Sequence, residues 1–433
     1  MSVLFTDVEV DGERVSVAIG DGPDDIVIDG GGGALIPGLH DHHIHLAAMA
    51  AADRSLQLSS DDLDGALRQR HAELAPDVWI RAVGYDERDH GPLGRDRLDG
   101  LAPGRPVRVQ HRSGALWVLS GAAVQQLDAP SDQLFRMDDW LRERMPHDDP
   151  PDVGAVARRL ATYGVTGVTD ATPSSSVEQL DVLARVATIR VHAMGGVALA
   201  SAPFPNGLER GPVKVVIADH ELPPLDDVCD AISAAHDSGR SVAIHCVTRV
   251  ALVLALAAWD TIGAAAGDRV EHGAVVSPEL AARVAELGLT VVTQPAFVAT
   301  RGDRYLADVD ADDQPHLYPC ASLLAASVEV GGSTDAPFGP EDPWVAMSAA
   351  IERRTSLGTA LGEGERISAQ RALELFLSPP QRPGGPPRRV GPGATDVCLL
   401  DAPLSVVLRE PSAEHVRMVV CRGAVTYDRG GTS

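Results

Sequence analysis

The stretch Pro37-Gly38-Leu39-His40-Asp41-His42-His43-Ile44-His45-Leu46 carries four histidines and an aspartate within six residues. It predicts a buried strand, on which successive side chains point to opposite faces. His43 and His45 would share one face with Asp41, and His40 and His42 would share the other. Because two imidazoles two residues apart on a strand can chelate one divalent ion, either pair is a candidate metal site.

The chain that follows this stretch alternates short apolar runs with helical patterns, which is typical of βαβ units around a parallel sheet. The predicted strands are Ala34–Ile36 running into Leu39–Leu46, Gly164–Ala171, Ile189–Val197, Val213–Ala218, Val242–Val247, Arg269–Val275, Thr290–Ala296 and Ser327–Ser333. The predicted helices are Val153–Tyr163, Val177–Ala187, Leu225–Ser238, Ala251–Ala266, Pro278–Leu287, Cys320–Ala326, Trp344–Arg354 and Ala369–Leu377. Eight strands separated by helices predict an α/β fold, a (β/α)8 TIM barrel.

Both ends of the chain are rich in short strands. Residues 1–36 and 388–433 are therefore predicted to pair into one small β-sandwich domain. The barrel is predicted to cover residues 37–387. Residues 52–150, between the first two barrel strands, are interpreted as an insertion with strands of its own at Val78–Val83 and Pro106–His111.

Metal-capable side chains recur where later predicted strands end. One strand ends at His245, the next at His272, and the last runs into Asp335. The carboxyl ends of barrel strands meet at one face, where the active sites of such barrels lie. We therefore expect these three residues to come together with the histidines of the first strand.

The chain contains a single lysine, Lys214, among 37 basic residues. It lies in the apolar strand Val213–Ala218, where a protonated amine is costly unless it is paired. A deprotonated lysine can react with carbon dioxide to give an anionic carbamate that bridges two metals, whereas an arginine stays protonated. The alternative is that Lys214 is a chance survivor at the edge of a strand.

Acidic residues outnumber basic residues by 61 to 37, which gives a net charge of -24. This charge argues against nucleic acid and anionic membranes as partners. The longest apolar run, Val250–Trp259, is too short to span a bilayer, and no secretory signal is visible. Five dispersed cysteines indicate a reducing compartment, so a cytoplasmic location is expected.

The sequence offers fewer candidates for substrate binding than for metal binding. The segment after the seventh strand is interpreted as a loop that holds Gln294, Arg301 and Arg304. Either arginine could bind a substrate carboxylate bidentately, or could pair with a neighbouring aspartate instead. Tyr85 and His111 in the insertion are further candidates for lining the pocket.

The order of these residues resembles the amidohydrolase superfamily, and most closely its amidohydrolase-3 branch, which includes YtcJ-like and N-substituted formamide deformylase proteins. The supporting stretches are Gly84-Tyr85-Asp86-Glu87, Val242-Ala243-Ile244-His245, Arg269-Val270-Glu271-His272, Thr334-Asp335-Ala336-Pro337 and the tail Gly391–Asp401. The frame Pro-Gly-x-x-Asp-x-His-x-His of this family selects His43 and His45 over the other pair. The resemblance covers nearly the whole chain.

This resemblance implies a metal-dependent hydrolase with one or two divalent ions, usually zinc. The implied ligands are His43, His45 and Asp335 for the first ion, and His245 and His272 for the second, with carbamylated Lys214 as the bridge. An unmodified lysine would leave one ion. Asp335 would be the general acid/base that takes a proton from the activated water and passes it to the leaving nitrogen.

The predicted reaction is hydrolysis of a non-peptide C–N bond in a small molecule, either an amide, a formamide or a cyclic amide. The alternatives are an ester, lactone or imine at the same site, including deamination, or a metal-free barrel that serves as a binding scaffold. One departure from the family pattern is Asp219-His220-Glu221, where Asp-Gly is expected. His220 is therefore a further pocket residue or an alternative ligand. Related proteins are often dimers, so a homodimer is also allowed.

Overall fold

The computed structural model describes residues 2–20, 24–58, 62–145, 151–173, 175, 177–200, 202–391 and 393–430. The chain divides into two compact units. The first comprises residues 1–46 and 153–433, and the second comprises residues 47–152.

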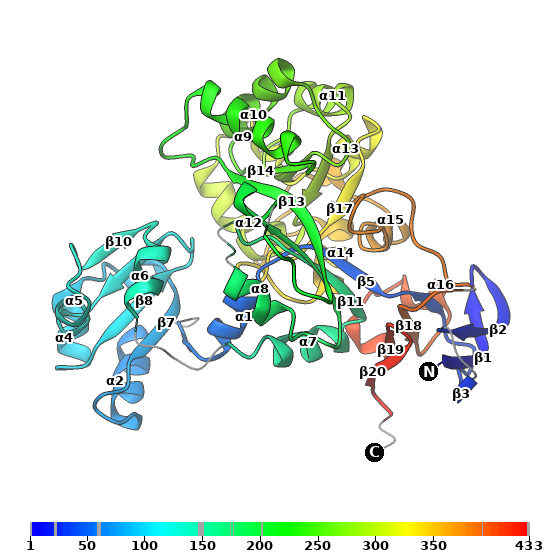
Figure 1. Ribbon diagram of the computed structural model, residues 1–433, viewed down its shortest axis with the longest axis horizontal. Coiled ribbons are helices and arrows are strands. Elements are labelled where there is room, and N and C mark those ends of the chain that lie inside the picture. The colour runs from blue at the N-terminus through cyan, green and yellow to red at the C-terminus, as the bar shows by residue number, and fades with distance from the viewer. Residues whose placement is uncertain are drawn as a thin grey trace. The chain divides into compact units, whose positions relative to one another are not determined.

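The first unit is built around a parallel sheet that has eight strands within the described residues, in chain order (Figure 1). The strands are β5 (Leu39–Ile44), β11 (Val165–Asp170), β12 (Arg190–Gly195), β13 (Leu208–Val216), β14 (Val242–Cys246), β15 (Arg269–His272), β16 (Thr290–Thr293) and β17 (Val330–Gly332). The chain after β17 returns to β5, where the amide of Asp335 donates to the carbonyl of His43 at 2.9 Å. The predicted (β/α)8 barrel is confirmed.

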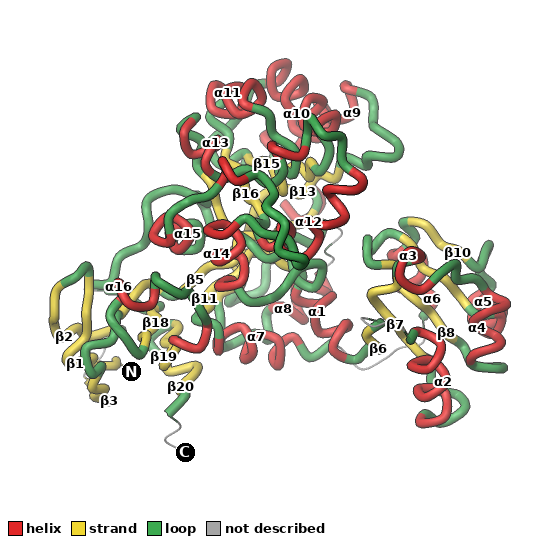
Figure 2. Tube along the Cα trace, turned by 180° about the vertical axis from the view of Figure 1, so that it is seen from behind, coloured by secondary structure: helices red, strands yellow, loops and turns green. Residues whose placement is uncertain are grey.

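Helices surround the strands of this barrel (Figure 2). They are α7 (Val153–Thr162), α8 (Val177–Leu183), α9 (Leu225–Asp237), α10 (Arg249–Ile262), α11 (Pro278–Glu286), α12 (Ala296–Asp308), α13 (Ala321–Ala325), α14 (Pro343–Glu352) and α15 (Ala369–Glu374). In α10, Thr248 caps the first turn, and Leu252, Leu256 and Trp259 form one buried stripe at helical spacing. Every helix predicted for the barrel is present, with shifts of a few residues at the ends.

The segment after the seventh strand, which is predicted to be a loop, forms the helix α12. The segment contains Pro295 and Gly302, and both residue types commonly break helices. In the structure Pro295 precedes the first turn of α12, where a proline costs little. Gly302 is needed for packing, because a Cβ atom there would lie 2.6 Å from the side chain of Thr355. Arg301 and Arg304 therefore lie on a helix and not on a loop.

Both ends of the chain form two small sheets that pack on each other. One sheet has the order β2-β1-β3 and the other has the order β20-β19-β18-β4. Their strands are β1 (Ser2–Val10), β2 (Glu13–Ile19), β3 (Asp24–Asp29), β4 (Leu35–Pro37), β18 (Val397–Leu400), β19 (Val416–Cys421) and β20 (Ala424–Asp428), and a short helix, α16 (Leu404–Val407), follows β18. Phe5, Ile19, Leu35, Leu399 and Val420 belong to one buried core between the sheets. The expected β-sandwich is therefore built from both chain ends, while its boundaries as a domain stay a prediction.

The second unit contains a sheet of its own, in the order β10-β9-β8-β7-β6. Its elements are α1 (Leu46–Asp53), β6 (Leu56–Gln57), α2 (Leu63–Glu73), β7 (Ile80–Tyr85), α3 (Glu87–His90), α4 (Arg95–Leu101), β8 (Val107–His111), β9 (Leu116–Leu119), α5 (Gly121–Leu127), β10 (Gln133–Phe135) and α6 (Asp138–Arg144). Strands β7 and β8 correspond to the two strands predicted for the insertion. The predicted end of that insertion, residue 150, lies outside the described residues.

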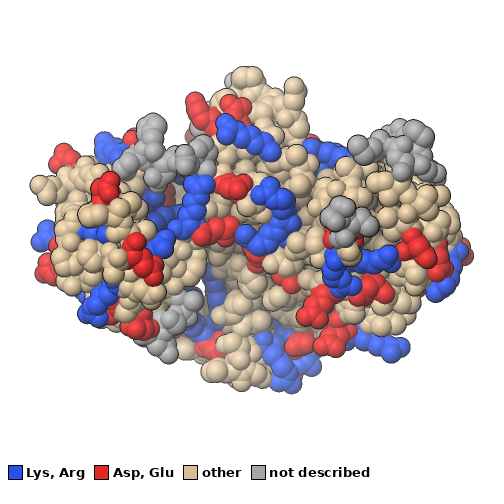
Figure 3. Space-filling model, turned by 90° about the horizontal axis from the view of Figure 1, so that it is seen from below, with Lys and Arg blue, Asp and Glu red and all other residues tan. Residues whose placement is uncertain are grey.

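The charge of the surface and the length of the helices are relevant to possible nucleic-acid and membrane partners. Acidic and basic side chains are intermixed on the face that Figure 3 shows. Among the described residues, no helix is at once long enough and apolar enough to cross a membrane. The expected absence of nucleic-acid and membrane partners stays a prediction.

Candidate metal centre

The carboxyl end of β5 places two histidines beside an aspartate. Nε2 of His43 lies 3.5 Å from Oδ1 of Asp335, and Nε2 of His45 lies 3.3 Å from the same oxygen. A tetrahedral ion with bonds of about 2.0 Å needs ligand atoms that are about 3.3 Å apart. The spacing of His43, His45 and Asp335 therefore fits a divalent ion.

The other histidine pair of this strand has different partners. Nε2 of His40 lies 3.0 Å from Oγ1 of Thr169, and Nε2 of His42 lies 3.0 Å from Oγ of Ser378. Both rings are buried, so each needs a polar partner. Of the two pairs that strand alternation allows, the structure thus brings His43 and His45 to the acidic residue at the end of the barrel.

Two further predicted ligands lie beside this cluster. The ring of His272 is centred 4.8 Å from that of His43 and 4.4 Å from that of His245. Burial lowers the pKa of His43 and of His272 well below the usual value, so the neutral, metal-binding form of each ring is favoured. Four of the predicted ligands therefore form one contiguous group with Asp335.

Lys214 comes from β13, at the register position opposite Ala243 in β14. Its side chain is buried, and its Nζ atom has no hydrogen-bond partner among the described residues. Burial lowers the pKa of this amine below its usual value. A buried, unpartnered amine is costly when it is protonated, and the predicted carbamylation of Lys214 stays a prediction.

The backbone bends at two of the candidate ligands. His272 has a φ of 71° and Asp335 has a φ of 54°, in the left-handed region that non-glycine residues seldom adopt. His272 directly follows Glu271, so regular alternation would put the two side chains on opposite faces of β15. The left-handed turn breaks that alternation. Such local strain is typical of functional sites.

Glu271 is the functional residue that sequence reasoning missed. Its carboxylate is completely buried, contacts Nδ1 of His43 and accepts a 2.6 Å hydrogen bond from Nε of Arg269. A signal was available in the sequence, because Arg269 and Glu271 are two residues apart on a strand and so share a face. Two opposite charges that are buried on the inner face of a barrel strand are costly unless each of them is paired.

Gln294 lies behind a candidate ligand. It is fully buried, and its Oε1 is 2.8 Å from Nδ1 of His272, while its Nε2 donates to Oγ of Ser333 at 2.9 Å. Gln294 therefore holds the ring of His272 in place. Its assignment to substrate binding stays a prediction.

Three other residues predicted to bind substrate, Arg301, Arg304 and His220, also belong to the first unit. Arg301 donates to the carbonyl of Phe338 at 2.5 Å, and the ring of Phe338 is centred 5.7 Å from that of His45. Arg304 lies on the same helix as Arg301, and His220 is exposed in the turn after β13. The substrate-binding roles of all three residues stay predictions.

Tyr85 and His111 belong to the second unit. Their rings are centred 5.9 Å apart, and Nε2 of His111 lies 3.0 Å from Oε2 of Glu87. Asp86, Glu87 and His111 form another group of metal-capable side chains. However, Nδ1 of His111 already contacts Ser113 at 2.7 Å, so both ring nitrogens are engaged. The predicted pocket-lining roles of Tyr85 and His111 stay predictions.

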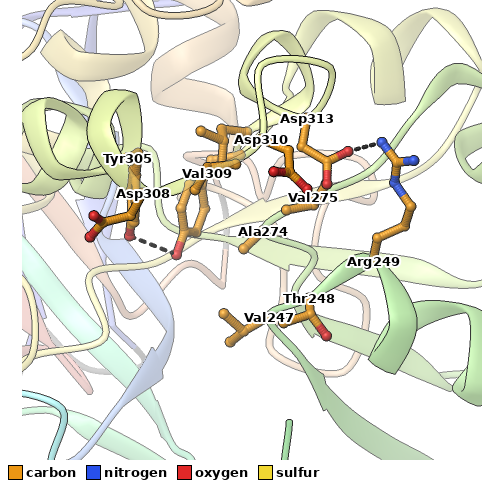
Figure 4. A pocket seen from close by; sticks show the side chains of 12 residues that line it. Val247, Thr248, Arg249, Ala274, Val275, Tyr305, Asp308, Val309, Asp310 and Asp313 are labelled. Atoms are coloured by element: carbon orange, nitrogen blue, oxygen red, sulfur yellow. Dashed lines mark hydrogen bonds and ion pairs between the residues drawn. The ribbon is translucent and has the colours of Figure 1, made fainter.

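A pocket of about 290 Å³ opens at the carboxyl ends of β14 and β15 (Figure 4). Val247, two residues after His245, and Ala274, two residues after His272, both line it. Its other lining residues are Thr248, Arg249, Val275, Tyr305, Asp308, Val309, Asp310, Asp313, Leu317 and Tyr318. An ion pair joins Arg249 to Asp313 within this lining. The pocket has the size of a small-molecule site, and the residues that line it include none of the predicted metal ligands.

A (β/α)8 barrel with a metal-compatible cluster at the carboxyl ends of its strands has this cluster where the active sites of barrel enzymes lie. The chain belongs to the amidohydrolase family, whose model matches residues 26–427. It is therefore an enzyme of the amidohydrolase type, and the predicted resemblance is confirmed. This membership favours a catalyst over the alternative of a metal-free scaffold.

Individual relatives are distant but extend over most of the chain. N-substituted formamide deformylase of Arthrobacter pascens is 24% identical over 472 residues, which cover 89% of this chain and 84% of that protein. The amidohydrolase-like protein YtcJ of Bacillus subtilis (strain 168) is 22% identical over 419 residues, with 80% and 79% covered. Among solved structures, an uncharacterized metal-dependent hydrolase from Pyrococcus furiosus superposes with a TM-score of 0.69 at 19% identity, covering 87% of this chain and 93% of the other.

Proposed function

We propose that this amidohydrolase cleaves the C–N bond of a small N-substituted amide, with N-substituted formamides as the leading substrates, at a zinc site. The observation that carries the proposal is the cluster of His43, His45 and Asp335, in which both histidine Nε2 atoms lie within 3.5 Å of one Asp335 oxygen and all the ligand atoms lie within 4.8 Å of one another. The name of the Arthrobacter pascens relative supports the choice of substrate. The same site could act on an ester, a lactone or an imine, so these bonds belong in the same substrate screen.

Zinc suits this site because its ligands are nitrogen and oxygen atoms and because a catalytic zinc keeps a position open. His43, His45 and Asp335 would hold one ion, and His245 and His272 would hold a second. Carbon dioxide would add to the neutral amine of Lys214, with loss of a proton to solvent, and the resulting carbamate would bridge the ions. A zinc ion bound by these residues would lower the pKa of a bound water molecule to about 7 and would polarise the substrate carbonyl.

Asp335 is the residue proposed to move the proton. Its Oδ1 atom is buried, accepts no hydrogen bond from the described residues and would bind the metal, so the second carboxylate oxygen, Oδ2, is the one proposed to face an attacking water. The carboxylate would take the proton of that water and deliver it to the nitrogen of the leaving amine. Delivery completes the reaction, because an amine leaves readily only after it is protonated.

The pocket beside β14 and β15 supports a small, partly apolar substrate. Val247, Ala274, Val275 and Leu317 contribute apolar surface, and Tyr305 adds a phenol ring. We propose that this surface receives the substituent on the amide nitrogen.

The proposal includes no nucleic-acid or membrane partner and allows a homodimer. It also includes a cytoplasmic setting, which is supported by the five free, buried cysteines.

Metal content per chain tests the proposed site. We expect elemental analysis of protein produced with zinc and bicarbonate to give about two equivalents, since the proposed site has two ligand sets and a bridging lysine. About one equivalent would point to a single ion with unmodified Lys214. A value near zero, together with no hydrolysis of amides or formamides, would contradict the proposed function.

A substitution in the pocket tests whether this pocket receives the substituent on the amide nitrogen. Ala274→Phe should fill part of the pocket and lower kcat/KM for N-benzylformamide by about 10- to 200-fold, because one badly placed group in an apolar pocket costs that much. The value for N-methylformamide should change by less than about 3-fold in the same assay. Ala264→Phe, in the exposed loop after α10, is the matched control. An equal loss on both substrates would show that the pocket does not receive the substituent.

A further inference from the structure

One buried carboxylate joins the strand that carries the candidate histidines to the turn that carries Asp335. The side chain of Asp41, in β5, is completely buried. Its Oδ1 atom accepts hydrogen bonds from the amide of His43 at 3.1 Å and from the amide of Thr334 at 3.2 Å. Its Oδ2 atom accepts a hydrogen bond from the hydroxyl group of Thr334. Both oxygens of this carboxylate are therefore engaged by groups at, or next to, a candidate metal ligand.

The bond from Asp41 to the amide of His43 spans an irregularity in β5. Asp41 pairs with Val168 of β11 and Ile44 pairs with Asp170, so β5 advances by three residues while β11 advances by two. An extra residue of this kind is a bulge, which re-aims the side chains around it and is common beside active sites. A bond from an aspartate to the amide two residues further on favours such a local bend. Asp41 therefore stabilises the bend at His43.

The turn after β17 is tied to β5 on both sides of the candidate acid/base. Besides the contacts of Thr334, the amide of Asp335 donates to the carbonyl of His43 at 2.9 Å. The amide of His45 donates to the carbonyl of Ala336 at 3.0 Å. Asp335 has a φ of 54°, and a non-glycine residue keeps such a conformation only where the surrounding structure over-determines it. These bonds supply that constraint.

From these contacts we infer that Asp41 is a positioning residue for the metal centre. Its carboxylate holds both the bulge at His43 and the turn at Asp335, and so sets where the Nε2 atoms of His43 and His45 lie relative to Oδ1 of Asp335. Asp41 takes no part in the proposed proton transfer and acts only through the residues that it holds. The inference rests on the proposed function in one respect only, namely that a divalent ion binds at His43, His45 and Asp335.

Zinc affinity of the metal-free, full-length protein, measured by competition with a chelator, tests the inference. Asp41→Asn keeps the size of the side chain, but its amide nitrogen cannot accept the hydrogen bond from the hydroxyl group of Thr334. We expect the dissociation constant for zinc to rise by about 10- to 100-fold, the usual effect of losing an outer-shell partner. Wild-type affinity in the folded variant would overturn the inference.

A buried aspartate elsewhere in the barrel is the matched control. Asp268 directly precedes β15, and its buried carboxylate accepts hydrogen bonds from the amides of Val242 and Ala265 at 2.8 and 3.0 Å. Asp268→Asn should lower the melting temperature but keep the zinc affinity within about 3-fold of the wild-type value, because Asp268 and His272 lie at opposite ends of β15. An equal loss of affinity in Asp268→Asn and Asp41→Asn would reflect general stability and would overturn the positioning role.

Substitutions at Thr334 provide the test if Asp41→Asn does not fold. Thr334→Val removes the hydroxyl group that donates to Asp41 and nearly keeps the shape of the side chain, whereas Thr334→Ser keeps the hydroxyl group. We expect Thr334→Val to weaken zinc binding by about 10-fold and Thr334→Ser to remain within about 3-fold of the wild-type affinity. Equal affinities in the two variants would overturn the inference.

Hydrogen exchange in the metal-free protein keeps this inference separate from the proposed function. The amides of Asp335 and His45 join the turn to β5, and NMR should show them exchanging at least about 10-fold faster in Asp41→Asn, because the turn loses a buried, charge-assisted bond. If the wild-type protein bound no zinc, the proposed function would fail, while these rates would still decide whether Asp41 holds the turn. Unchanged exchange of both amides in the folded variant would refute the positioning role.

Discussion

Asp335→Asn should lower kcat by about 100- to 10,000-fold on any substrate that the enzyme hydrolyses. The amide side chain cannot take a proton from water, and it binds a divalent ion more weakly than a carboxylate does. The fold should persist, because asparagine tolerates the left-handed φ of 54° at this position better than most residues. Steady-state kinetics, together with thermal unfolding of the same samples, would measure both effects.

A matched aspartate on the same unit provides the control for this variant. Asp303 lies on α12, where its carboxylate accepts hydrogen bonds from the hydroxyl groups of Thr355 and Ser356. Asp303→Asn should therefore leave kcat within about 3-fold of the wild-type value. If Asp335→Asn retained more than a tenth of wild-type activity, the general acid/base would have to be another residue.

Lys214→Arg should remove the second metal and most of the activity. An arginine keeps the positive charge but cannot form a carbamate, because its guanidinium stays protonated. We expect the metal content to fall from about two equivalents to about one, and kcat to fall by at least about 100-fold, since a ligand lost from the metal itself costs more than an outer-shell partner. Elemental analysis and kinetics on the same preparation would measure both changes.

A neutral substitution at Lys214 separates the effect of losing the carbamate from the effect of placing a fixed positive charge at this position. Lys214→Met removes the amine from this buried position and leaves an apolar chain of similar length. It should lose the second metal as Lys214→Arg does. Two equivalents of metal and wild-type turnover in both variants would show that Lys214 is not a ligand.

The fold could be predicted from the sequence because its signals are local. Most of the barrel strands are short apolar runs, and the segments between them have helical patterns. Helix α12 differs from the predicted loop, and its segment contains Pro295 and Gly302, which are local signals of a break. Contacts outside the segment override that signal, with Gly302 packed against Thr355.

The candidate site was predictable in part. His43, His45 and Asp335 were named from their places at strand ends and from the family frame. In the structure, the Nε2 atoms of His43 and His45 both lie within 3.5 Å of Oδ1 of Asp335. The selection of His43 and His45 over His40 and His42 depended on the resemblance, because strand alternation allows both pairs. In the structure, Thr169 and Ser378 provide the partners of the other two histidines.

The sequence by itself therefore determined the barrel, the order of the metal-capable residues along it and the singular position of Lys214, because these follow from periodicity and residue type. Only the tertiary structure decided that Glu271 supports His43 and that Gln294 supports His272. The first pair is separated by 228 residues. Such contacts depend on the closure of the barrel and on the left-handed turns at His272 and Asp335, and neither the pairing nor the backbone turn leaves a pattern in neighbouring residues.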